Sequence, residues 1–269
     1  MALTIPNQLV TLGGSDFQST TTLSNLHHHS IVTKEFDPLR FEAAASLQLQ
    51  LQSQSQIQHQ SDETEEQFTH LIASPYNDPS HLLDISALDH QDRIFALALS
   101  YLKPIRSDYA TAAYTESFNW SEIFSLVKSF SEAENRTWTR RSYYVVIFRS
   151  ILLPDADGDR LYDLDAHSHR EAIASGGLLK YWFGSKNAER RNLATCEYYL
   201  SIRTCRTLAD EKGIWRSRND ARLGGRGPWH AQARAAATVM YEEILFTTLR
   251  LDILDGAEGW ELTDWKDSA

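Results

Sequence analysis

The chain has 269 residues, of which 42% are apolar, with a formal net charge of −10 and a pI near 5.4. That length suits one sizeable core with tails, or at most two domains. The acidic balance disfavours nucleic acid and anionic membranes as main partners, because both are bound through basic faces. No apolar run approaches the ~18 to 20 residues of a membrane span.

The sequence also lacks the features of a secreted protein and of a cysteine-rich protein. Residues 1–14 lack the basic start, apolar core and cleavage site of a secretory signal. The cysteines are Cys196 and Cys205 alone, too few for a disulfide framework or a four-thiolate zinc site. We therefore expect a cytoplasmic protein with neither a nucleic-acid nor a membrane partner.

The first 80 residues differ in composition from the rest. A Ser/Thr-rich stretch at 19–24 precedes three histidines at 27–29, and an alternating Leu/Gln tract at 47–51 precedes an acidic run at 62–66. The alternation is also typical of a half-buried strand, but such a composition buries too little apolar area to offset its ordering entropy. We expect a disordered low-complexity tail over residues 1–80.

Residues 82–135 are predicted to form a helical N-terminal extension. Ser86 is a plausible N-cap, and apolar residues from Leu88 to Leu102 recur at helical spacing until Pro104 ends the helix. A second helix starts near Asn119. Together these helices offer too little core to fold alone, so we expect them to pack on the following domain.

Strand-like and helix-like segments alternate between Tyr143 and Leu254. Their order is strand, helix, strand, strand, helix, strand, which predicts an α+β fold, a ferredoxin-like βαββαβ sandwich over residues 142–269. Two helices cover one face of such a sheet, and the other is left for a partner or a small molecule. The expected elements are strand 143–151, helix 161–174, strands 178–183 and 192–196, a helical region from Ser217 or Asn219 interrupted at 224–228, and strand 246–254.

A segment of 17 residues, Glu197–Gly213, breaks this order. Without it, Asn192–Cys196 would run directly into Ile214–Ser217 as one strand leading to a helix cap. We interpret the segment as an in-frame retained intron, because codons for Cys196 and the two residues after it can contain a splice-donor sequence. The alternative is a genuine surface hairpin.

Several motifs resemble a widespread fungal family of uncharacterised proteins. The resemblance runs from about Leu82 to the C-terminus, departs at 197–213, and implies a fold more than a function. The motifs are Asp108–Tyr114, Ser117–Trp120, Gly176–Gly184 and Trp215–His230.

A weaker resemblance rests on Trp215, Ser217, His230 and Tyr241. This pattern is similar to the dimeric α/β-barrel superfamily, which includes antibiotic-biosynthesis-type monooxygenases and haem-degrading enzymes. The resemblance implies a homodimer with a cavity between sheet and helices, and chemistry without a cofactor.

The candidate catalytic residues are His230, Tyr241 and His169. Imidazole titrates near neutrality and can act as a base or orient a carbonyl, although a histidine at a helix start is also often a satisfied packing residue. The candidate substrate-binding residues are Trp182, Trp215 and His167. We expect no metal: His167 and Glu171 are four residues apart on one helix, but no third ligand is evident.

Two functions remain open from the sequence. The first is a small-molecule-binding or dimerisation domain whose partners are an apolar small molecule and a second copy of the chain. The alternative is a cofactor-independent, monooxygenase-like enzyme for an apolar aromatic or polyketide-like compound. A closed aromatic cavity reached by His230 or His169 would favour the enzyme. A sheet face packed flat by the N-terminal helices would favour a non-catalytic protein that uses this face to dimerise.

Overall fold

The computed structural model describes residues 69–76, 78–195 and 213–266. The expectations for the tail up to residue 68 and for Glu197–Lys212 lie outside these residues. The strands are β1 (His70–Leu71), β2 (Leu83–Asp84), β3 (Arg141–Leu152), β4 (Leu178–Lys180), β5 (Arg191–Ala194), β6 (Gly213–Trp215), β7 (Tyr241–Ile253) and β8 (Trp260–Asp264). The helices are η2 (Pro79–His81), η3 (Ile85–Ala87), α3 (His90–Leu99), α4 (Tyr114–Ser117), α5 (Trp120–Ala133), α6 (Gly158–Ala174), α7 (Arg218–Gly224), α8 (Pro228–Met240) and η4 (Asp255–Ala257).

A six-stranded antiparallel sheet organises the chain, in the order β4-β6-β3-β7-β8, with β5 also beside β3. The predicted α+β class is confirmed. The predicted strands are numbered here by their place along the chain. Across the sheet, the second predicted strand (β4) lies beside the third (β5 and β6), the third lies beside the first (β3), and the first lies beside the fourth (β7). The hairpin strand β8 and the small pair β1–β2 were not predicted.

Helix boundaries differ from the sequence prediction in identifiable ways. α3 begins after Asp89, whose carboxylate accepts a hydrogen bond from the N–H of Asp92, so Asp89 is the N-cap rather than Ser86. Ser86 bonds instead to the carboxylate of Asp84 at the start of η3. α8 ends at Met240 and β7 begins at once, so Tyr241 lies in a strand.

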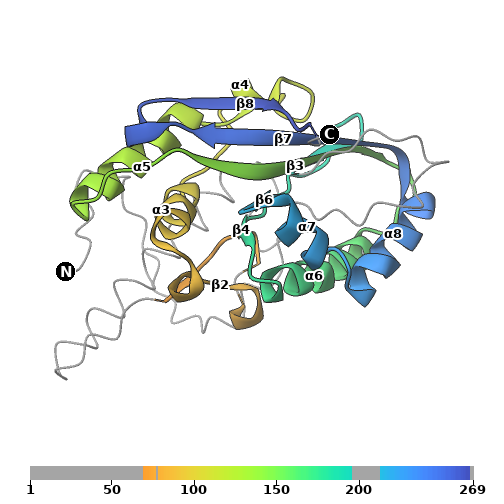
Figure 1. Cartoon of the computed structure of the whole chain (residues 1–269). Helices are drawn as coiled ribbons and strands as arrows, with labels where there is room; N and C mark the ends of the chain where they lie inside the picture. The colour runs from red at the N-terminus through yellow and green to blue at the C-terminus, as the bar shows by residue number, and fades with distance from the viewer. Residues whose placement is uncertain (1–68, 77, 196–212, 267–269) are drawn as a thin grey trace, which may run out of the picture.

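The middle of the sheet, along β3, is buried on both faces by the chain itself. Along β3, residues Tyr143, Val145 and Ile147 enter one core cluster and Tyr144, Val146 and Phe148 enter another, as the two-residue period of a strand requires. α3 and α5 pack over the first face, and α6 and α7 pack over the second (Figure 1).

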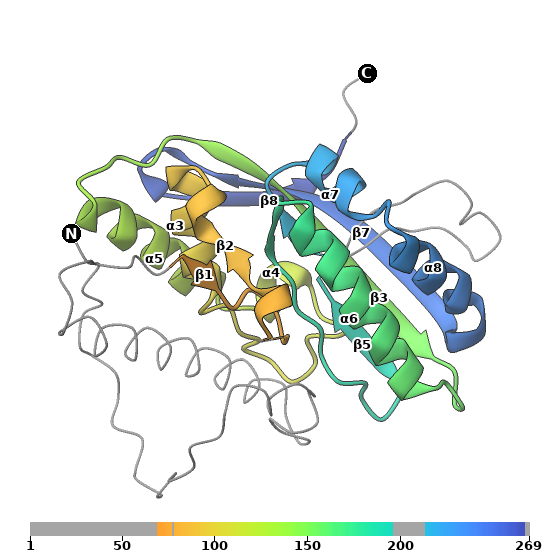
Figure 2. The ribbon, with the colours of Figure 1, turned by 90° about the horizontal axis from the view of Figure 1, so that it is seen from below.

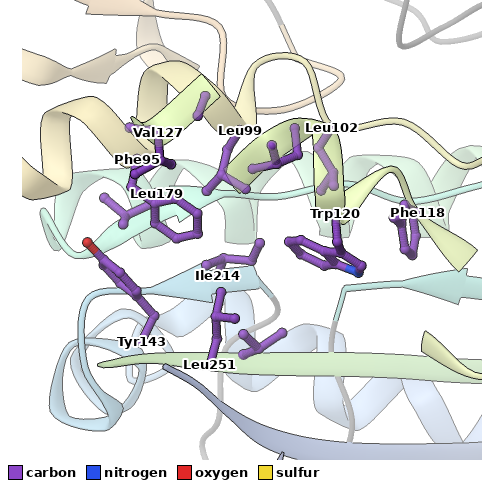
Figure 3. Packing of buried hydrophobic residues seen from close by; sticks show 14 of the residues in the cluster. Phe95, Leu99, Leu102, Phe118, Trp120, Val127, Tyr143, Leu179, Ile214 and Leu251 are labelled. Atoms are coloured by element: carbon purple, nitrogen blue, oxygen red, sulfur yellow. The ribbon is translucent and has the colours of Figure 1, made fainter. Parts of the chain in front are cut away.

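The core under α3 and α5 is densely packed with large side chains. Phe95, Leu99 and Trp120 from the helices meet Tyr143, Ile214 and Leu251 from the sheet (Figure 3). The sheet face that the sequence prediction left for a partner or a small molecule is therefore covered here by α3 and α5.

β5 and β6 lie in line along the same edge of β3. Ala194 pairs with Phe148, and Gly213 pairs with Val146. A single β3 residue, Ile147, separates these two pairs, so there is room opposite it for one residue, Thr195. The chain between Ala194 and Gly213 is 17 residues longer than this pairing needs. The pairing of β5 and β6 with β3 thus agrees with one strand that is interrupted by an insertion of the predicted length.

Candidate functional site

Glu171 of α6 fastens the start of α8. Its carboxylate accepts hydrogen bonds from the backbone N–H of Trp229 at 2.9 Å, the backbone N–H of His230 at 3.1 Å and the Nδ1–H of His230 at 2.6 Å. Gly227, the N-cap of α8, has no side chain to fill this role, and a Cβ there would lie 2.1 Å from the Glu171 carboxylate. Burial opposes ionisation of Glu171, but the bonds from Trp229 and His230 prevail and lower its pKa.

Behind this contact, His167 and Trp229 form a parallel stack. Their ring centroids are 3.8 Å apart and their planes differ by 9°. The stack forms one wall of a groove of about 440 Å³ between α6 and α8, two helices that Figure 2 shows side by side. The groove is lined by Arg160, Asp163, Leu164, His167, Trp229, Gln232, Ala235, Ala236 and Val239.

A second polar cluster is buried between η2 and α6. The Nδ1 atoms of His81 and His169 are 2.7 Å apart, and both side chains are almost fully buried. The Nε2 of His81 lies 3.2 Å from the carboxylate of Asp78. Burial lowers the pKa of His81 to about 4 and that of His169 well below its usual value, so both rings are neutral at pH 7.

These partners assign the tautomers of the two rings. Asp78 can only accept, so the Nε2 of His81 carries its hydrogen and its Nδ1 accepts from the Nδ1–H of His169. The Nε2 of His169 is then a bare lone pair, and it has no hydrogen-bond partner among the described residues. Asp78, His81 and His169 thus form a line of polar contacts from near the surface to an imidazole nitrogen in the core.

Asp165, one helical turn before His169 on α6, is the remaining polar residue of this cluster. Its carboxylate accepts from the hydroxyl of Tyr76 at 2.6 Å and from that of Tyr181 at 2.7 Å. Burial, followed by the nearby Asp165 charge, raises the pKa of Tyr76 well above its usual value. The Tyr76 ring also stacks on His81 at 4.6 Å. This cluster is packed rather than hollow, since rings fill the space around the carboxylate.

The structure separates the predicted site residues. His167 lines the groove, His230 holds its wall through Glu171, and His169 lies in the buried cluster. Trp182 and Trp215 belong to the cores on opposite faces of the sheet. Tyr241 begins β7 with its ring against Phe148 at 5.3 Å.

Sequence reasoning missed His81, Tyr76 and Trp229 as site residues. Tyr76 falls within the segment expected to be a tail, and His81 lies just after it, outside both predicted segments. His81 meets His169 across 88 positions of sequence. Trp229 did carry a signal: it precedes His230 and follows the proline that opens α8.

The described residues show neither a metal cluster nor a membrane-spanning helix. No group of three or more His, Cys, Asp or Glu side chains among them is arranged to hold a metal ion. The sequence spacing would allow Glu171 to bind a metal together with His167, but in the structure the Glu171 carboxylate is hydrogen-bonded to His230. Each helix in residues 69–266, where described, is too short or too polar to cross a bilayer.

Comparison with known proteins places the chain in a family. Residues 72–264 match the model of the family described as PB2B2.08-like. The chain belongs to the PB2B2.08-like family. A relative, the UPF0643 protein PB2B2.08 of Schizosaccharomyces pombe (strain 972 / ATCC 24843), is 31% identical over 207 residues, which cover 74% of this chain and 86% of the relative. The predicted resemblance to an uncharacterised fungal family is thereby confirmed.

The PB2B2.08-like match spans β3 to β8 as well as α3 and α5, so it contains both polar clusters and the groove. Neither the description of the family nor the name of the relative states an activity. No solved structure matches the chain.

Proposed function

We propose that this PB2B2.08-like chain is a binding protein that holds a small apolar or aromatic molecule in the α6–α8 groove. The observation that carries the proposal is the preformed wall, in which Trp229 stacks on His167 while Glu171 fixes the backbone of Trp229. A wall held in place before binding loses little entropy when a ligand arrives.

The lining of the groove suits a ligand with an apolar body and a polar end. Its volume of about 440 Å³ falls in the range of small-molecule sites. Leu164, Ala236 and Val239 supply apolar surface, and Val239 is 63% exposed. Arg160 and Asp163 bring charges of both signs, which could orient a polar substituent.

We infer that the scaffold beneath the groove is ferredoxin-like. The inference is supported by the antiparallel order β4-β6-β3-β7 and by the placement of α6 and α8 on one face. The domain limits 82–135 and 142–269 are part of the same proposal. The packing of α3 and α5 on the other face supports a binding protein over an enzyme, because it fills the space where a cavity would lie.

The groove is tested by two matched tryptophan substitutions on α8. Ala235 and Ala231 are both exposed and one turn apart, but only Ala235 lines the groove. In a ligand-observed NMR screen of aromatic fragments, we expect Ala235→Trp to weaken binding by about tenfold or more and Ala231→Trp to leave it unchanged. Equal behaviour of the two variants, or no fragment binding to the unsubstituted chain, would refute the proposal.

A catalytic role is the second candidate, and the bare Nε2 of His169 favours it. Its imidazole is neutral and offers this lone pair as an acceptor to a substrate hydroxyl, although burial makes it a weak base. Because rings fill the space around it, the cluster would act on an electron-rich aromatic only after those rings move aside. Molecular oxygen would be the oxidant, without a cofactor. Oxygen uptake with hydroquinones that disappears in His169→Phe would support it, and uptake no faster than in buffer would exclude it for these compounds.

A further inference from the structure

The outer edge of β7 is only partly paired. β7 pairs with β3 along its length, but β8 covers it only from Leu249 to Ile253, with one more bond from the N–H of Trp265 to the C=O of Thr248. Within residues 69–266, where described, no strand pairs with the outer side of 243–247. At the opposite edge of the sheet, Tyr181, which directly follows β4, donates its N–H to the C=O of Ala73.

The direction of the free backbone groups follows from Thr248. Its C=O points outward, and in an antiparallel strand outward groups recur at every second residue. Ile244 and Phe246 therefore present their N–H and C=O groups at the open edge. The side chains of Ile244, Leu245 and Phe246 are half-buried. No lysine, proline or glycine, which commonly protect an open edge, lies between Glu243 and Thr248.

We propose that a second copy of the chain occupies this edge, so that two β7 strands pair antiparallel around a two-fold axis at Leu245. In this register Ile244 of each copy exchanges backbone hydrogen bonds with Phe246 of the second copy. The two side chains then form an aromatic and β-branched cross-strand pair, which is a favourable combination.

Charge disfavours one alternative register. With the axis at Leu245, the exposed Glu243 lies opposite Thr247 of the second copy. An axis at Glu243 would set two carboxylates against each other, which is destabilising. The other acidic residue nearby, Glu242, is already paired with Arg190 at 2.8 Å.

The edge also suits a second copy because the faces of the sheet do not. α3 and α5 occupy one face and α6 and α7 the other at the middle of the sheet, so pairing through a face there would have to displace helices. Edge pairing displaces none of them, and it does not depend on whether the groove binds a ligand.

Two lysine substitutions on the same face of β7 distinguish this dimer from general edge stickiness. Leu245→Lys places two ammonium groups at the axis and should abolish the dimer. Thr247→Lys places an ammonium group opposite Glu243 of the second copy and should preserve or strengthen it. Sedimentation velocity at roughly 1 to 100 µM protein reports the outcome. A monomeric unsubstituted chain at the highest concentration, or loss of the dimer in both variants, would overturn the proposal.

A disulfide test covers the case in which a lysine variant fails to fold. Cα atoms of a non-hydrogen-bonded antiparallel pair lie about 4.5 Å apart, within reach of a disulfide. With Cys196 and Cys205 replaced by serine, Leu245→Cys should cross-link two copies on mild oxidation, whereas Thr247→Cys should not. Equal cross-linking of both variants, or none at Leu245→Cys, would contradict the register.

Discussion

Glu171 shows how one carboxylate can set the geometry of a groove. Replacing it with alanine leaves the N–H of Trp229 and two donors of His230 without their acceptor. We expect Glu171→Ala to lower the free energy of unfolding by about 1 to 3 kcal/mol. Its stabilisation should be present above pH 4.5, the usual pKa of the group, and be lost as the pH falls through the lowered folded-state pKa.

Urea denaturation of matched variants measures this effect. The control is Glu116→Ala, since Glu116 makes an exposed ion pair with Arg106 at 2.9 Å. That substitution should change stability by less than about 0.5 kcal/mol. Equal losses for the two variants would show that Glu171 is an ordinary surface carboxylate.

His81 should make the stability of the protein depend on pH. Its folded-state pKa of about 4 lies below the usual 6.5, so between these values the unfolded chain binds a proton that the folded chain does not. Stability from this residue is complete above pH 6.5 and is lost as the pH falls to about 4, a total of about 3 kcal/mol. His81→Asn keeps an acceptor for His169 and removes the titration.

The quantity to measure is the difference between the two proteins across pH 4 to 6.5. Asp92 titrates in the same range, because burial raises its pKa to about 6, and its effect has the opposite sign. It is present in both proteins and cancels in the difference. A constant gap in stability between the protein and His81→Asn would show that His81 is not held neutral.

Residue-scale prediction from the sequence succeeded where the signal was local. His167 and His230 were identified as candidates by their helix positions; His167 lines the groove, and His230 bonds to the Glu171 carboxylate that also holds Trp229. Their partners could not be identified in this way, because Glu171 and His230 meet across 59 residues. The pairing of His81 with His169 depends likewise on a tertiary contact.

At the scale of elements, the interrupted strand gives the sharpest prediction. Deleting Glu197–Gly213 should join β5 to β6 in the register that β3 already imposes. The variant should fold with unchanged circular dichroism and gain about 1 to 3 kcal/mol, because a loop no longer has to be closed. Deleting one residue more, Cys196–Gly213, should be disruptive, because Ile214 and Trp215 would exchange faces.

The outcome of the two deletions decides between the interpretations of the segment. If the 17-residue deletion fails to fold, the segment is an integral part of the protein. Sequencing of transcripts tests its origin: messages that always keep the segment would refute the retained intron.

Element order followed from the sequence because hydrophobic periodicity is local. β3, α6 and α7 were all foreseen close to their observed positions. The limits of β7 were not, because its first residues from Tyr241 continue a helix-like pattern and are strand only through pairing with β3. β8 was not predicted because its hydrophobic pattern is short and its residues are half-buried or exposed.

At the scale of the whole molecule, one chain covers both faces of its sheet and leaves the groove on the outside. Trp182 and Trp215 are 3% and 0% exposed, so a ligand cannot reach them without opening a core. Trp229 stands at the groove. The tryptophans therefore report where a small molecule binds.

The most direct test of the binding site is a titration followed by the indole N–H resonances of the seven tryptophans. The resonance of Trp229, assigned with Trp229→Phe, should shift as an aromatic fragment is added, while those of Trp182 and Trp215 stay in place. Shifts at Trp182 or Trp215 with Trp229 unmoved would place the ligand in the core and contradict the account.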